Sequence, residues 1–155
     1  MSTFDYTQEE RQRDISAGTY KKFYIETPIE DGTFIVAAED TNAILVSLQI
    51  EDPSGDAWPE MLVVDIYCTS DAAGETVAAP SNIDLTVETG DAGMVVYDDI
   101  ASTGSASVRT NDAGLVQMTF TNDEDEAVTD FYVTAILPNG KYVVSGVLDF
   151  ADDTP

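Results

Sequence analysis

The residue types that this chain lacks limit the chemistry that it could perform. The 155 residues include no histidine, so a serine or cysteine nucleophile has no partner base that titrates near neutral pH. Lysine can replace histidine as a base, but Lys21 and Lys22 lie in the N-terminal segment and Lys141 follows a Pro-Asn-Gly turn. The glycine-containing stretch at 90–93 carries a carboxylate that would repel phosphate. We therefore predict that the protein is not an enzyme and has no catalytic residues.

Carboxylates are the abundant polar groups, with 30 acidic residues against 6 basic ones. Two carboxylates roughly 5–10 Å apart can hydrolyse a glycoside, but so many acids make no single pair informative. The segment Asn-Asp-Glu-Asp-Glu at 122–126 gathers oxygen ligands of the kind that calcium prefers, yet it lacks the spaced Asp-x-Asp-x-Asp-Gly pattern that wraps one ion. We interpret it as a solvated loop and predict no metal site and no cofactor. Calcium held by residues from several loops is the alternative.

The single cysteine, Cys68, excludes an internal disulfide. Together with the absence of histidine, it also excludes the common zinc, copper and haem sites. Cys68 lies on the same alternating face of its segment as Leu62, Val64 and Ile66. We therefore predict that its side chain is a small buried apolar group.

The net charge of −24 is carried by one part of the chain. Residues 1–25 hold four acids and four bases, whereas residues 26–155 hold 26 acids and only two bases, Arg109 and Lys141. Such a surface repels nucleic acid and anionic membranes, so we expect neither as a partner. A high-salt habitat would favour the same composition and is an alternative cause of the acidity. The division predicts a neutral arm over 1–25 and an acidic domain over 26–155.

The arm has the composition of an attachment segment. Thr7 and Glu10 fit a capping box and no helix breaker follows before Gly18, so we predict a short helix at about 8–17. Four of the six bases and five aromatic residues stand in the arm, and arginine and aromatic side chains commonly anchor interfaces. The residues that we expect to contact a partner are Phe4, Tyr6, Arg11, Arg13, Ile15, Tyr20, Lys21, Lys22 and Phe23. The alternative for residues 20–25 is the first strand of the domain.

Beyond the arm, the apolar residues recur with a period of two, which indicates β-strands. The clearest runs are 44–50, 83–87, 116–120 and 131–137. Turn sequences separate them, and the Pro-Asn-Gly at 138–140 predicts a hairpin over 131–149. The small-residue stretches 69–82 and 98–107 are expected to be long loops. About seven to nine short strands, with no helix after residue 25, predict an all-β Greek-key sandwich.

Three stretches follow one another in an order typical of one domain family. A strand leads into the Asp-Pro-Ser-Gly turn at 52–55, Val-Arg-Thr-Asn-Asp-Ala-Gly-Leu-Val-Gln-Met-Thr-Phe occupies 108–120, and Phe-Tyr-Val-Thr-Ala at 131–135 precedes the hairpin turn. Over roughly residues 40–150 the chain resembles the bacterial immunoglobulin-like (Big-type) domains of surface adhesins and phage virion proteins. Those domains have a Thr-Asp-x-x-Gly turn, in which Asn111 here stands where aspartate is commoner. The resemblance implies an immunoglobulin-like β-sandwich.

The same resemblance implies a role in a virion. The N-terminus has no basic start, apolar centre or small-residue cleavage site, so we expect no secretory signal and folding in the host cytoplasm. A short arm joined to one such domain is similar to phage accessory proteins. We therefore predict a phage structural protein: a capsid decoration, head-fibre or tail accessory protein. Its arm would bind the major capsid protein or a neighbouring virion subunit, within a homo-oligomeric assembly.

The only tryptophan, Trp58, bears on the alternatives. It stands beside Pro59 in a turn region, where a lone tryptophan usually plugs the end of a sandwich. An exposed Trp58 would instead offer a stacking platform for sugar. Together with tyrosines in the loops, it would then make the protein a carbohydrate- or host-surface-binding module. A third alternative is an internal assembly or tail subunit that oligomerises through its edge strands.

Overall fold

The structure, a computed structural model, describes residues 29, 31–88, 90–122 and 130–150. The predicted arm over 1–25, with its helix and its nine partner-binding residues, lies outside the described residues, and so does most of the acidic segment 122–126. The described part contains nine strands and one helical turn. These elements are β1 (Asp31–Val36), β2 (Ala43–Glu51), β3 (Val63–Thr69), β4 (Ile83–Val87), β5 (Met94–Asp99), α3 (Ile100–Thr103), β6 (Ser105–Arg109), β7 (Leu115–Asn122), β8 (Tyr132–Ile136) and β9 (Tyr142–Val144).

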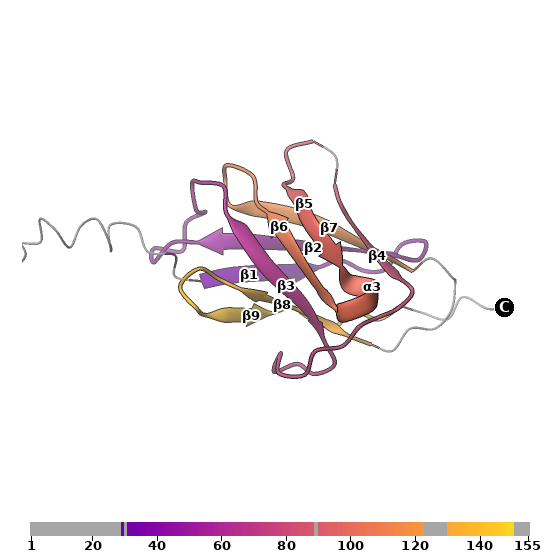
Figure 1. Ribbon diagram of the computed structural model, residues 1–155. Coiled ribbons are helices and arrows are strands. Elements are labelled where there is room, and N and C mark those ends of the chain that lie inside the picture. Colours follow the sequence, from indigo (N-terminus) through magenta and orange to yellow (C-terminus); the bar gives the residue numbers. More distant parts are fainter. Residues whose placement is uncertain (1–28, 30, 89, 123–129, 151–155) are drawn as a thin grey trace, which may run out of the picture.

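The strands form two antiparallel sheets that face each other (Figure 1). One sheet has the order β1-β2-β7-β4 and the other the order β5-β6-β3-β8-β9. Strands β2 and β7 are neighbours in the first sheet, and β3 and β8, which follow them in the chain, are neighbours in the second. These orders match the A-B-E-D and C-F-G sheets of an immunoglobulin-like sandwich. The predicted all-β sandwich is confirmed.

One feature of the topology departs from the immunoglobulin pattern. Strands β6 and β5 extend the second sheet beyond β3, as two extra strands do in variable-type domains. In this chain, however, they come after β4, which belongs to the other sheet. The long loop 70–82 therefore crosses from β3 in the five-stranded sheet to β4 in the four-stranded sheet. The chain then returns to the five-stranded sheet with β5 and β6. This loop was predicted from its composition and is confirmed.

The core lies between the sheets and follows the predicted alternation. Every second residue of β2 and β7 is buried, and their register pairs Leu48 with Val116 and Val46 with Met118. Phe131, beside the second sheet, meets Phe120 of the first edge to face, with ring centroids 6.0 Å apart. Cys68 is fully buried in β3, as predicted.

Two turns follow the predicted chemistry. In the 131–149 hairpin, the Leu137 carbonyl accepts the Gly140 N–H at 2.9 Å, and Gly140 has a φ of 85° that favours glycine. In the turn before β7, Asn111 takes the position expected for aspartate. Its Oδ1 accepts the backbone N–H groups of Ala113 and Leu115. The hairpin and the turn at 111–114 are both confirmed.

The prediction of a loop over 98–107 was wrong. That stretch contains the end of β5, the helical turn α3 and most of β6, so the expectation of no helix after residue 25 also fails there. Serine and alanine have low strand propensity, but β6 lies between β5 and β3 and pairs with both. Ala106 and Val108 are buried, and tertiary pairing therefore overrides local preference. Within the described residues, no helix is long and apolar enough to cross a membrane.

Candidate functional site

Every tyrosine in the described residues projects from the same surface, the outer face of the five-stranded sheet. Tyr67 alternates with the buried Ile66 and Cys68, and Tyr132 precedes the buried Val133, so both point away from the core. The register places Tyr142 opposite Ile136 and Tyr97 opposite Ser107 on that same side. We call this surface the tyrosine face, and define it by Tyr67, Tyr97, Tyr132 and Tyr142 together with Thr134, Ile136 and Val144.

The outer face of the four-stranded sheet is different in kind. Many of its outward residues are hydroxyl or amide side chains, namely Thr33, Ser47, Gln49, Thr86, Gln117, Thr119 and Thr121. Gln117 donates to Ser47 there at 3.3 Å. Tyrosine is a residue type enriched at protein interfaces. The two faces therefore differ in their capacity to bind, and the tyrosine face is the candidate.

An apolar groove of about 390 Å³ runs over the tyrosine face. Its lining residues are Tyr67, Thr69, Gly74, Glu75, Val77, Thr134, Ile136 and Tyr142. Val77, Ile136 and Tyr142 are about half exposed, at 56%, 42% and 53%. Glu75 is the one charged residue that lines the groove, on a domain that is otherwise rich in carboxylates. We call this feature the groove.

One wall of the groove is the loop that contains Gly74, Glu75 and Val77, and the carboxylate of Asp71 binds several of its backbone N–H groups. Asp71 accepts the backbone N–H groups of Ala73 and Glu75 through Oδ1 and that of Thr76 through Oδ2. The backbone hydrogen bond from Glu75 is the largest cause that lowers the pKa of Asp71. Three backbone N–H groups of the loop are therefore held by a side chain of the loop itself.

Gly74 seats this loop against the sheet. Its φ is 73°, and a Cβ at this position would stand 2.7 Å from Thr134 Oγ1 and 2.8 Å from Val144 Cγ2. Only glycine allows so close an approach with that backbone conformation. The groove is thus shaped by a glycine contact between the loop and strands β8 and β9.

A second, smaller hollow of about 190 Å³ lies on the other side of Tyr67, toward β5 and β6. Its floor is polar, because Ser107 Oγ donates to Asp65 Oδ1 at 2.6 Å. On its far side the charge of Asp99 raises the pKa of Tyr97. Tyr67 therefore separates an apolar groove from a polar hollow on one continuous face.

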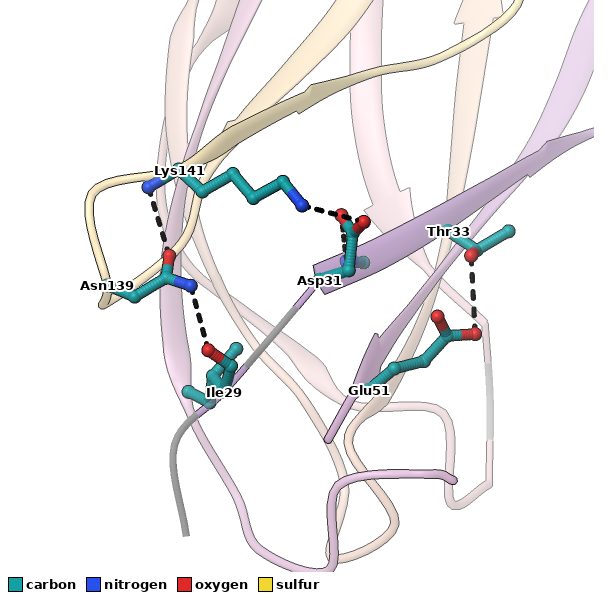
Figure 2. A network of polar contacts seen from close by, with 7 residues as sticks. Ile29, Asp31, Thr33, Glu51, Asn139 and Lys141 are labelled. Atoms are coloured by element: carbon teal, nitrogen blue, oxygen red, sulfur yellow. Dashed lines mark hydrogen bonds and ion pairs between the residues drawn. The ribbon is translucent and has the colours of Figure 1, made fainter. Parts of the chain in front are cut away.

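The N-terminal end of the described domain is tied to the β8–β9 turn (Figure 2). Asn139 Nδ2 donates to the Ile29 carbonyl at 2.8 Å, and Asn139 Oδ1 accepts the backbone N–H of Lys141 at 2.9 Å. Lys141 Nζ forms an ion pair with Asp31 at 2.8 Å, and this hydrogen bond is the main cause that lowers the Asp31 pKa. The chain therefore enters the domain three residues from Tyr142.

Phe150 marks the opposite end of the sandwich. Its ring stacks on Phe131 with centroids 6.1 Å apart, and Phe131 precedes β8 whereas Asn139 follows it. The five residues of β8 and the two that follow it separate Phe131 from Asn139 by about 20 Å. Ile29, which is bonded to Asn139, and Phe150 consequently lie at opposite ends of the described domain.

Trp58 is the one residue of the predicted site that the structure describes. It is 6% exposed and belongs to the core between the sheets, which agrees with the plug and not with an exposed stacking platform. Its indole Nε1 has no hydrogen-bond partner among the described residues. The tyrosines that were expected in loops stand in strands instead.

Within the described ranges, no group of three or more histidine, cysteine, aspartate or glutamate side chains is arranged to hold a metal ion. No protein-family model matches the chain, and no curated protein matches it. A solved structure with some likeness is the crystal structure of the GAE domain of yeast GGA1. It is 9% identical, with 81% of this chain and 97% of that chain covered and a TM-score of 0.29, which supports no conclusion about function.

Proposed function

We propose that this protein is a non-enzymatic structural component of a phage virion, of the capsid-decoration, head-fibre or tail-accessory kind. Its arm over residues 1–25 attaches it to the major capsid protein or to a neighbouring virion subunit. The acidic sandwich then projects from the particle. The observation that carries this proposal is the division of charge, with no net charge in the arm and −24 in the remainder of the chain.

The geometry of the domain supports the proposal. The described chain begins at the β8–β9 turn, and Phe150 lies at the other end of the sandwich. A domain held at its N-terminal end therefore stands away from the surface that holds it. Of the domain's two basic residues, Lys141 pairs with Asp31 at that same end.

Electrostatics would act in opposite ways on the two parts. Acidic domains repel one another in solution, which opposes association through the domains before assembly. The arm has no net charge and carries the arginine and aromatic residues that commonly make interfaces. Attachment through the arm allows many copies to bind to one shell in a homo-oligomeric arrangement, while their domains stay apart.

The test compares the full chain with a protein that begins at Glu26, each mixed with purified capsids and separated by sedimentation. We expect loss of capsid binding on truncation, with an unchanged β-rich circular dichroism spectrum. Replacing Lys21 and Lys22 by glutamine in the full chain keeps the length and should weaken capsid binding, because both lysines are among the expected partner contacts. Undiminished capsid binding by the truncated protein would contradict attachment through the arm.

A carbohydrate- or host-surface-binding module is the second candidate, and the tyrosine face is the observation that favours it. Tyrosine rings can stack on sugar rings, and the Asp65–Ser107 pair beside Tyr67 could bind hydroxyl groups. In that case a glycan would bind equally well with and without residues 1–25. Tyr67→Ser would abolish glycan binding, whereas Thr119→Ser on the opposite sheet would leave it unchanged.

A further inference from the structure

The groove is an apolar opening on a highly charged domain, and its position relative to the arm suggests what covers it. Ile136, Tyr142 and Val77 line the groove and expose large parts of their side chains. Apolar patches on a protein surface commonly mark places where another segment binds. A volume of about 390 Å³ accommodates a few side chains of an extended segment and not a folded domain.

We propose that the groove is the docking site for this chain's own residues 20–25 in the unassembled protein. The inference goes beyond the proposed function, because it concerns the free protein and holds for any partner of the arm. The segment reads Tyr-Lys-Lys-Phe-Tyr-Ile, so it combines apolar and aromatic side chains with two lysines.

The first argument for docking is that the chain before Ile29 is long enough to reach the groove. Asn139 fixes the carbonyl of Ile29, and Tyr142, which lines the groove, is three residues further along the same hairpin. Extended chain spans about 3.3–3.6 Å per residue, so the four residue steps from Ile29 to Ile25 cover about 13 Å. The segment 20–25 can therefore lie on the tyrosine face of its own domain.

The second argument for docking is that the groove has acidic residues near it and the segment 20–25 has two lysines. Glu75 lines the groove, and Asp65 lies on the same face beside Tyr67. Lys141, the basic residue closest in sequence to the groove-lining Tyr142, is already paired with Asp31. Lys21 and Lys22 would bring positive charge to this acidic margin. If the segment docks in an extended conformation, alternation would turn Phe23 and Ile25 to the same side, toward the groove.

The same physical argument favours the chain's own arm over a second copy. Two domains that each carry a charge of −24 repel each other, so docking between copies is opposed at low salt. A short tether instead gives a local concentration in the millimolar range. Binding of the arm to a partner would then uncover the tyrosine face only on the assembled particle.

The experiment uses the full chain with a spin label at Thr19→Cys and ¹⁵N-labelled backbone amides. The native Cys68 is fully buried, so the label goes to the introduced thiol. We expect the amide signals of Val77, Ile136 and Tyr142 to lose intensity several-fold more than those of Gln117 and Thr119 on the opposite sheet.

Matched variants separate docking from mere proximity. Ile136→Thr in the groove should restore the intensity at Val77 at least two-fold. Ile35→Thr, an equivalent change at a 66% exposed position of β1, should not. Both variants keep a β-branched residue in a strand, and their amide spectra report whether the fold is retained.

Two outcomes would overturn the proposal. One is equal signal loss in the two threonine variants, which would mean that the tether alone brings the label near. The other is signal loss in a mixture of spin-labelled ¹⁴N protein with ¹⁵N protein that carries no spin label, which would mean that the groove binds the arm of a second copy.

Discussion

Asn111 offers a sharp test of how the turn before β7 is held. Its side chain, 8% exposed, makes three hydrogen bonds to backbone groups. Oδ1 accepts the N–H groups of Ala113 at 2.9 Å and Leu115 at 3.0 Å, and Nδ2 donates to the Asp91 carbonyl at 2.6 Å. The last bond ties this turn to the loop before β5, and aspartate could not make it.

The magnitudes follow from those bonds. Each hydrogen bond contributes about 1 kcal/mol net. Asn111→Ala removes all three, but Asp91 and Ala113 are exposed and regain water, so the expected loss of unfolding free energy is about 2 kcal/mol. Asn111→Asp keeps the two accepted bonds and loses the one to Asp91, for a loss of about 1 kcal/mol. In a domain of this size, about 2 kcal/mol lowers Tm by roughly 4–8 °C.

Urea unfolding followed by the fluorescence of Trp58 measures these differences, since the carbonyl and Cβ of Trp58 lie next to Gly114 of the same turn. Asp112→Ala, at an exposed neighbouring position, is the control and should change stability by less than about 0.5 kcal/mol. The reasoning fails if Asn111→Asp is as destabilising as Asn111→Ala, or if Asn111→Ala behaves like the control.

Three further predictions concern the domain itself. Lys141→Met removes the exposed ion pair with Asp31 and should cost about 0.5 kcal/mol at neutral pH. Because that pair lowers the Asp31 pKa, the stabilisation exists above the unfolded pKa of 3.8 and disappears as the pH falls through the lower folded pKa. Urea unfolding at a neutral and an acidic pH measures the difference in stability between the native protein and the variant. A difference that persists in acid would contradict this prediction. Burial raises the pKa of the Cys68 thiol to about 12, so a thiol reagent should modify it only as the protein unfolds, and rapid labelling of the native protein would contradict this. Gly74→Ala combines a positive φ with a clash and should cost about 2–3 kcal/mol in thermal or urea unfolding. The control, Gly55→Ala, is at a residue with a φ of 84° and open space around it, and should cost about 1 kcal/mol. Equal losses in the two variants would show that the loop contact is unimportant.

The parts of the fold that could be predicted are those with strong local signals. The alternation in β2, β4 and β7 placed their buried residues correctly, and the Pro-Asn-Gly turn placed the last hairpin. In these segments the side-chain pattern and the turn chemistry agree with the tertiary structure. Strand β6 shows the opposite case, because Ser105, Ala106 and Ser107 carry no strand preference of their own. Its conformation comes from its neighbours β5 and β3.

The tyrosine face could be anticipated only in part. Alternation alone puts Tyr67 on the side opposite Cys68, and Tyr132 on the side opposite Val133. What the sequence could not give is that β3, β5, β8 and β9 share one sheet, since that depends on pairing between residues far apart in the chain. The groove depends in addition on how the 70–77 loop returns over β8, which the positive φ of Gly74 permits.

The positions of the two ends of the domain also decide how it responds to a mechanical pull. If the arm is held and Phe150 is drawn away, the force runs along β1, whose six residues pair with β2 from Asp31 to Val36. Hydrogen bonds in an antiparallel ladder lie across the strands, so such a force loads them together and does not open them one at a time. At the other end, bonds from Ser145 to Val133 and from Leu148 to Phe131 carry the load into β8 in the same way. Tension between the ends is thus borne in shear, the direction in which paired strands resist separation.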